Sequence, residues 1–276
     1  MLHRYRVAVV QLNSGEDKSA NLEQAGGQLA RAAATGAALV VLPEMFNGFG
    51  RWETMTAAAE PIPGTTHDWL AEQARRHRVW LVGGSITERE PGESRCHNTS
   101  LLFDPDGRLA GKYRKIHLFD ADVPGQPTAR ESHWMAGGRE PTTTDTPLGQ
   151  LSQAICYDLR FSALFEHYAI AGSELIVVPA AFTVTTGHAH WEVLLRARAI
   201  ECQAYVIAAN QVGPHPGTFS TYGHSLIIDP WGNVLADAGE SVGIAYADLN
   251  IEHLRAIRHR IPVAAHRRPI LKRYGS

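Results

Sequence analysis

The chain has 276 residues, of which 44% are apolar and 20% charged, and its formal net charge is −2. This composition is ordinary for a globular protein, and the length allows a substantial core to be buried. The near-neutral charge gives no electrostatic reason to expect nucleic acid or an anionic membrane as a partner.

The number of cysteines and the lengths of the apolar runs indicate the cellular compartment. Cys96, Cys156 and Cys202 are too few, and odd in number, for a disulfide framework. The apolar run near the N-terminus is too short for a secretion signal. No run approaches the ~18 apolar residues of a transmembrane helix. We therefore expect a soluble, cytoplasmic protein.

Strand-like and helical segments alternate in the first part of the chain. Apolar β-branched runs predict strands at 6–12, 38–44 and 79–86. Helical spacing predicts helices at 19–36 and 65–78, the first capped by Ser19 and ended by Gly36. The turn sequence DPDG within 98–115 predicts a β-hairpin.

The alternation resumes after an irregular segment. Residues 116–149 are rich in proline, glycine and threonine, and a segment this long without clear elements is more often functional than filler. Beyond it we expect strands at 151–157, 174–182, 204–210 and 243–249, helices at 161–172, 188–203 and 250–260, and a hairpin at 223–236. Two β-α-β halves, each extended by a hairpin, predict one α/β domain over 1–276.

The sequence disfavours both a nucleotide-binding site and a metal site. The chain has neither a GxxxxGK[ST] loop nor a GxGxxG after a strand, which disfavours a nucleotide site. The one candidate metal cluster is His188, His190 and Glu192, but residues two apart on a helix point away from each other. We expect no metal and no cofactor.

Cys156 admits two interpretations. A lone cysteine is commonly a buried apolar residue, but Cys156 ends a predicted strand just before a helix, where α/β folds gather their chemistry. A thiolate nucleophile also needs a base and an oxyanion donor. Glu44 and Lys115 end other predicted strands, but spacing alone does not show that they meet Cys156. A cysteine–histidine pair stays equally open, since fourteen histidines are available.

The blocks LVVLPEMF, GKYRKIHLFD, ARES and ICYDLRF stand in the order found in the carbon–nitrogen hydrolase (nitrilase) superfamily. The resemblance extends from about residue 6 to residue 270 and is greatest to the Nit branch of ω-amidases and deaminated-glutathione amidases. It implies an α-β-β-α sandwich that forms a homodimer or higher oligomer. The C-terminal tail, residues 260–276, is then expected at the subunit interface.

The resemblance also implies roles for the residues in these blocks. Glu44 would be the general base, Cys156 the nucleophile, and Lys115 the residue that stabilises the oxyanion, together with the backbone N–H of Tyr157. Glu131 would be a second glutamate that orients Lys115 and the substrate.

The implied substrate is a small amide with a distal carboxylate. Arg160 is the candidate partner for that carboxylate, and Phe182, Thr185 and Thr186 are candidates for the pocket wall. A nitrilase and an N-carbamoyl hydrolase are alternatives. The latter tends to have two adjacent arginines after its cysteine, whereas Leu159 occupies the first position here. A catalytically silent binding protein is the non-enzyme alternative.

Overall fold

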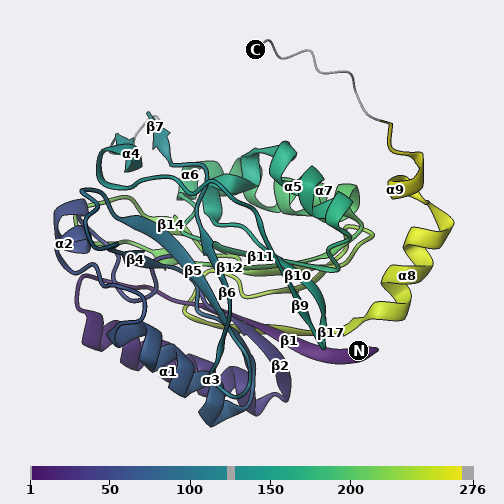
Figure 1. Cartoon of the computed structure of the whole chain (residues 1–276), viewed down its shortest axis with the longest axis horizontal. Helices are drawn as coiled ribbons and strands as arrows, with labels where there is room; N and C mark the ends of the chain where they lie inside the picture. Colours follow the sequence, from purple (N-terminus) through teal and green to yellow (C-terminus); the bar gives the residue numbers. More distant parts are fainter. Residues whose placement is uncertain (1, 123–127, 269–276) are drawn as a thin grey trace.

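The computed structural model describes residues 2–122 and 128–268, and in this part of the chain two large sheets lie face to face (Figure 1). The first sheet has the strand order β17 (Gly243–Asn250), β1 (Arg4–Gln11), β2 (Ala37–Val41), β3 (Trp80–Val82), β5 (His97–Phe103) and β4 (Ile86–Glu88), and β6 (Leu109–Arg114) also pairs with β5. Strands β1, β2 and β3 are parallel, and the remaining pairings are antiparallel.

The second sheet repeats this plan. Its order is β16 (Val234–Asp237), β15 (Leu226–Ile228), β12 (Tyr205–Asn210), β11 (Leu175–Ala180), β10 (Gly149–Gln153) and β9 (Thr142–Thr146). Strands β10, β11 and β12 are parallel, with antiparallel strands on both sides. Two short pairs stand apart, β13 (Val212–Gly213) with β14 (Thr221–Tyr222) and β7 (Asp120–Ala121) with β8 (Ala129–Arg130).

Helices cover the outer face of each sheet. Figure 1 shows α1 (Lys18–Ala34) and α3 (Thr65–His77) below the first sheet, and α5 (Ser162–Ala171) and α7 (Glu192–Cys202) above the second. The remaining helices are α2 (Trp52–Ala57), α4 (Glu131–Trp134), α6 (Val184–Thr186), α8 (Ile251–Arg260) and α9 (Val263–His266). A 3₁₀ turn (Cys156–Arg160) precedes α5, and a π-helical turn (Gly187–Trp191) precedes α7. No helix in the described ranges is both long and apolar enough to cross a membrane.

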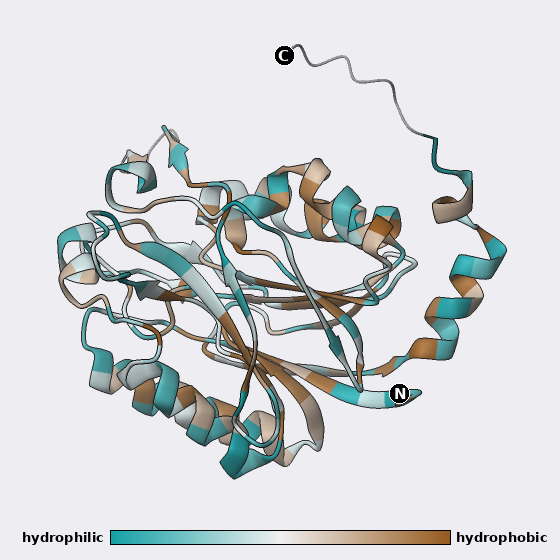
Figure 2. Ribbon diagram, in the orientation of Figure 1, coloured by the Kyte–Doolittle hydropathy of each residue, from teal (hydrophilic) through white to brown (hydrophobic). Residues whose placement is uncertain are grey.

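Strand periodicity explains the layers. In β1, Val7 and Val9 face the second sheet, whereas Ala8 and Val10 pack against the buried side of α1. Both faces of the central strands are buried, so these strands are apolar throughout, as Figure 2 shows by their brown colour. The expected α-β-β-α sandwich is therefore confirmed.

The main differences from the sequence predictions have local causes. The strand expected at 79–86 is broken at Gly84, which has a φ of +55° and separates β3 from β4. The strand expected at 151–157 ends at Gln153, before the turn that carries Cys156. Asp17 rather than Ser19 caps α1, because its carboxylate accepts hydrogen bonds from the backbone of the first helical turn.

The described part of the irregular segment 116–149 contains elements that the sequence did not indicate, namely the short pair β7–β8, the helix α4 and the strand β9. Strand β9 has the sequence TTTDT and forms the edge of the second sheet beside β10. Its side chains are polar on both faces, so no apolar alternation marks it. The helix expected at 188–203 is likewise altered, since its first turn is π-helical.

A buried carboxylate joins the three strands at one edge of the first sheet. Glu88 on β4 is 3% exposed and accepts hydrogen bonds from Thr99 of β5 and from Lys112 and Arg114 of β6. Burial alone would raise the pKa of Glu88, but the bonds from Arg114 and Lys112 lower it from 4.5 to about 2. Strand β6 leads directly to Lys115, so this carboxylate also fixes the approach to the site described below.

Glu88→Gln should lower the free energy of unfolding by about 3 kcal/mol at neutral pH, because both ion pairs are lost. When folding lowers the pKa of a carboxyl group, that group makes its full contribution to the stability of the folded protein at any pH above its unfolded pKa. That contribution disappears as the pH falls from 4.5 toward about 2. Urea unfolding over a series of pH values should therefore show that the difference in free energy of unfolding between the parent protein and Glu88→Gln becomes smaller in acid. The control is Glu72→Gln, which removes an exposed pair with Arg75. A difference that does not change with pH would contradict the prediction.

Candidate active site

A pocket of about 580 Å³ opens at the ends of strands from both sheets. Glu44 follows β2, Lys115 follows β6, and Cys156 follows β10. These three side chains line the pocket together with Glu131. The structure therefore brings together four residues that are separated by up to 112 positions in the chain, from Glu44 to Cys156 (156 − 44).

Glu44 is held from both sheets. Its carboxylate accepts hydrogen bonds from the Ala181 backbone N–H at 2.8 Å and from Lys115 Nζ at 2.9 Å. Its backbone carbonyl accepts a hydrogen bond from Gln211 Nε2 at 3.0 Å. Gly84 lies against the preceding residue, and a Cβ at this position would collide with the Pro43 carbonyl oxygen. Glycine is therefore needed where the β3–β4 connection supports the Glu44 turn.

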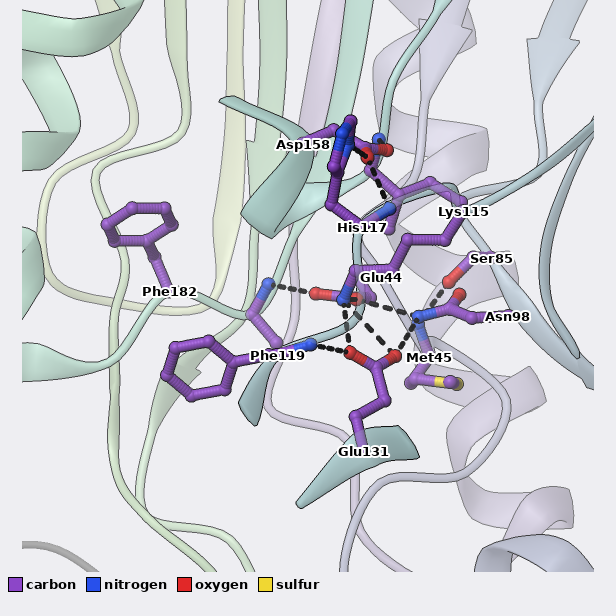
Figure 3. A network of polar contacts seen from close by, with 12 residues as sticks. Glu44, Met45, Ser85, Asn98, Lys115, His117, Phe119, Glu131, Asp158 and Phe182 are labelled. Carbon is purple, nitrogen blue, oxygen red and sulfur yellow. Dashed lines mark hydrogen bonds and ion pairs between the residues drawn. The ribbon is translucent and has the colours of Figure 1, made fainter. Parts of the chain in front are cut away.

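Lys115 lies between two carboxylates (Figure 3). Its ammonium group is 2.9 Å from Glu44 Oε1 and 2.9 Å from Glu131 Oε2. The Phe119 backbone N–H donates to Glu131 Oε2 at 2.6 Å, so the irregular segment folds back on its own glutamate. The ion pairs with Glu44 and Glu131 together fix the position of the Lys115 ammonium group beside Cys156.

Asn98 is a buried member of this network that sequence reasoning missed. It lies opposite Lys115 across the β5–β6 hairpin, where the Lys115 N–H donates to its carbonyl. The Asn98 amide donates to Glu44 Oε1 at 2.8 Å and to Glu131 Oε1 at 3.3 Å. The available signal was a run of polar residues, HNTS, that opens a fully buried strand.

The burial of Lys115 and Glu131, together with their charged neighbours, shifts the pKa values of these two groups. Burial alone would lower the pKa of Lys115, but Glu131 and Glu44 hold it well above its ordinary value, so the ammonium form persists. Burial raises the pKa of Glu131, and the Glu44 charge raises it further against the opposing effect of Lys115. The cluster is thus built around one cation shared by two acids.

Cys156 occupies a constrained turn at the floor of the pocket. Its φ is +46°, a left-handed conformation that residues other than glycine rarely adopt. The residue is 8% exposed. Burial raises the pKa of its thiol well above the ordinary value, and the Glu44 charge raises it further, whereas Lys115 opposes this rise. The resting group is therefore a neutral thiol with an acceptor carboxylate close by.

The wall of the pocket contains three of the four expected substrate-binding residues. Arg160, Phe182 and Thr186 line it, but Thr185 is exposed and is not among the lining residues. Thr183 lines the pocket in its place and contacts Thr186 through the two hydroxyl groups at 2.8 Å. Successive residues of the short α6 helix point in different directions, which explains why Thr186 lines the pocket and Thr185 does not.

Arg160 lies over aromatic rings at the pocket wall. Its guanidinium carbon is 5.1 Å from the centre of the Phe182 ring and 5.9 Å from that of Tyr157. Its Nη1 is 3.4 Å from Nδ1 of His190. Within the described ranges it forms no ion pair with a carboxylate, so its charge is available to a ligand.

Potential metal ligands gather at a different place from the one considered in the sequence. Within the described ranges, Glu90, Glu93 and His97 place one ligand atom each within 4.8 Å of one another. Both ring nitrogens of His97 already have acceptors, the Ala136 carbonyl at 2.9 Å and Glu93 at 2.8 Å. This group lies outside the pocket that holds Cys156.

Glu44→Gln should lower the pKa of Cys156, because it removes a negative charge that disfavours the thiolate. The rate of Cys156 alkylation by iodoacetamide, measured against pH by peptide mass spectrometry, should therefore rise at lower pH than in the parent protein. Glu174→Gln changes a similarly buried glutamate that does not line the pocket, and should leave the profile in place. A profile that is unchanged or shifted to higher pH in Glu44→Gln would contradict the prediction.

Comparison with known proteins agrees with this geometry. The chain is 42% identical over 264 residues to a human protein named "Omega-amidase NIT2", covering 96% of this chain and 95% of the relative. The crystal structure of Saccharomyces cerevisiae Nit3, described as a member of branch 10 of the nitrilase superfamily, superposes with a TM-score of 0.88 at 35% identity over 97% of each chain.

The Caenorhabditis elegans NitFhit structure also superposes with a TM-score of 0.88, at 37% identity, covering 96% of this chain and 65% of that longer one. The model of the family described as "Carbon-nitrogen hydrolase" matches residues 6–259. The chain therefore belongs to the carbon–nitrogen hydrolase family.

Proposed function

We propose that this carbon–nitrogen hydrolase is an ω-amidase, which hydrolyses the terminal carboxamide of a small 2-oxo dicarboxylic acid monoamide to the acid and ammonia. One observation supports the chemistry above all others, namely the buried contact of Glu44, Lys115 and Glu131 beside Cys156. The name of the human relative supports the choice of substrate class.

In the proposed first half-reaction, Glu44 accepts the thiol proton and Cys156 Sγ attacks the amide carbon. The carbonyl π electrons move to oxygen, and the resulting oxyanion binds the Lys115 ammonium group and the Tyr157 backbone N–H. The C–N bond then breaks as Glu44 returns its proton to the leaving nitrogen. Ammonia departs, and the acyl group stays on Cys156 as a thioester.

In the second half-reaction, water attacks the thioester and gives its proton to Glu44. The same donors stabilise the second oxyanion, and its collapse releases the acid and returns the proton to sulfur. Glu131 keeps Lys115 in place throughout, because the two groups are 2.9 Å apart and both are buried. No external cofactor is needed to balance either step.

Arg160 is the proposed partner of the distal carboxylate. Among the described residues that line the pocket, the cations are Lys115 and Arg160, and Lys115 is already paired with two glutamates. A guanidinium group can hold a carboxylate through two parallel hydrogen bonds. The proposed substrate would thus lie with its amide at Cys156 and its carboxylate at Arg160.

A deaminated-glutathione amidase is the second candidate. The segment HWEVLLRARAIE resembles that type, whereas TTGHAHW and HLFDADVPG resemble the ω-amidase type. Nitrilase and N-carbamoyl hydrolase activities are ranked lower, and Leu159 is the feature that disfavours the latter. The intact set of Glu44, Lys115, Glu131 and Cys156 disfavours a silent binding protein.

The outer side of α5 and α7 supports a homodimer. Ile170, Val193, Ile200 and Trp231 are all at least half exposed there or on the adjoining β15–β16 turn, and exposed apolar patches often mark interfaces. Arg267 pairs with Glu166 of α5 at 2.9 Å, so the expected tail contacts α5 at this residue, whereas residues 269–276 lie outside the described residues. Sedimentation equilibrium measures the subunit number.

A cytoplasmic location fits the cysteine content. Cys96, Cys156 and Cys202 are all free and buried. Free thiols of this kind are typical of a reducing compartment.

The protein should release ammonia from 2-oxoglutaramate faster than from deaminated glutathione, and Cys156→Ala should abolish both reactions. Coupled ammonia assays on the two substrates, side by side, measure the ratio. Cys202→Ala is the matched control, because Cys202 is also buried but does not line the pocket, so its removal should leave kcat unchanged. The proposal would be contradicted if Cys156→Ala turned over either substrate as fast as the parent protein. A preference of the parent protein for deaminated glutathione would also contradict it.

Arg160→Gln should lower kcat/KM for 2-oxoglutaramate by about 10- to 100-fold, since a charge-assisted hydrogen bond contributes about 1.5–3 kcal/mol. The loss should appear mainly in KM. Butyramide has no carboxylate, so its turnover should change little in the same variant. Arg31→Gln, on the distant helix α1, is the control for the loss of one positive charge. Equal losses for the two amides would exclude Arg160 as the carboxylate partner.

A further inference from the structure

Asp158 is a completely buried carboxylate two residues after Cys156, and the reaction proposed above does not use it. It lies in the 3₁₀ turn Cys156–Arg160 and is drawn beside His117 in Figure 3. Oδ1 accepts hydrogen bonds from the His117 backbone N–H at 3.0 Å and from His117 Nδ1 at 2.7 Å. Oδ2 accepts from the Tyr113 hydroxyl at 2.7 Å and from the Ile155 N–H at 3.0 Å.

The four donor groups come from residues close in sequence to two catalytic candidates. Tyr113 and His117 lie two residues before and two residues after Lys115. Ile155 directly precedes Cys156, and Asp158 itself follows it. One carboxylate therefore binds a residue on each side of Lys115, through the Tyr113 hydroxyl and the His117 N–H groups, and also binds the backbone N–H of the residue before Cys156.

These two segments come from different sheets. Lys115 follows β6 of the first sheet, whereas Cys156 follows β10 of the second. The apolar side chains between the sheets contribute an attraction that is not directional, so it does not by itself orient one polar group toward another. Hydrogen bonds to a buried carboxylate are directional and costly to leave unmade.

We propose that Asp158 is a positioning residue, which sets the distance between the Cys156 thiol and the Lys115 ammonium group and holds Cys156 in its left-handed turn. The proposal rests on the acyl-transfer function proposed above. Displacing reacting groups by about 1 Å can cost about 10²-fold in rate, so this carboxylate contributes to kcat without touching the substrate.

The neighbouring groups are arranged to keep Asp158 an acceptor. Burial raises the pKa of Tyr113 well above its ordinary value, and the Asp158 charge raises it further. The Tyr113 hydroxyl therefore keeps its proton and donates. The His117 ring stacks on Phe161, with ring centres 3.6 Å apart and planes inclined by 7°, and this fixes Nδ1 toward Asp158.

The test compares two tyrosine variants that each remove one buried hydroxyl. Tyr113→Phe removes a donor to Asp158, whereas Tyr5→Phe removes a donor to the Leu148 carbonyl, far from the pocket. At a similar loss of Tm, Tyr113→Phe should lower kcat about 10-fold with KM unchanged, a part of the 10²-fold cost of misplacement. Tyr5→Phe should leave kcat unchanged.

Asp158→Asn and two histidine variants extend the series. The asparagine amide would face two donors with its own N–H₂ group, so kcat should fall by about 10²-fold. His117→Ala should lower kcat, and His117→Asn should restore much of it, because the asparagine Nδ2 can replace the Nδ1 donor. The matched Tm values separate misplacement from unfolding.

Acylation of Cys156 by p-nitrophenyl acetate keeps this test separate from the substrate assignment. The release of p-nitrophenolate reports sulfur acylation whether or not 2-oxoglutaramate is a substrate. The acylation rate should fall in Asp158→Asn and Tyr113→Phe in step with kcat. Equal rates in Tyr113→Phe and Tyr5→Phe, or a parental acylation rate in folded Asp158→Asn, would overturn the proposal.

Discussion

The burial of one ammonium group between two carboxylates is the constraint on which the site depends. Lys115, Glu44 and Glu131 are each at most 4% exposed, and a charge buried to this extent is costly unless an opposite charge lies beside it. Removing charges from water is costly, so the surrounding backbone supplies the Ala181 and Phe119 N–H donors. The same arrangement places a cation in the pocket with Cys156, where the proposed reaction would form an oxyanion.

The sandwich explains why these charges meet. Parallel strands in each sheet end at the same side, and the two apposed sheets bring Glu44 and Cys156 together from separate layers. Gln211, from the end of β12, binds the Glu44 carbonyl, and Asp158 joins the segments around Lys115 and Cys156. Polar contacts between the sheets thus add directional constraints to an apolar interface.

The irregular segment 116–149 has a structural role at the same site. It carries Glu131 to Lys115 on the short helix α4, and its later part adds β9 to the second sheet. Its polar composition reflects edge pairing and delivery of a carboxylate, rather than disorder of the described residues. Aromatic residues and Arg160 also line the pocket, and the Arg160 guanidinium group lies over the Phe182 ring.

The sequence by itself determined the alternation of strands and helices and the two hairpins, because apolar periodicity is a local signal. The sandwich was implied by the resemblance to the carbon–nitrogen hydrolases. Motif resemblance also named Glu44, Lys115, Glu131 and Cys156. Only the tertiary structure decided that these side chains meet, that Asn98 and Asp158 join them, and that Thr183 rather than Thr185 lines the pocket. These outcomes depend on contacts between strands of two sheets and on the direction of single side chains, and neither leaves a periodic trace in the chain.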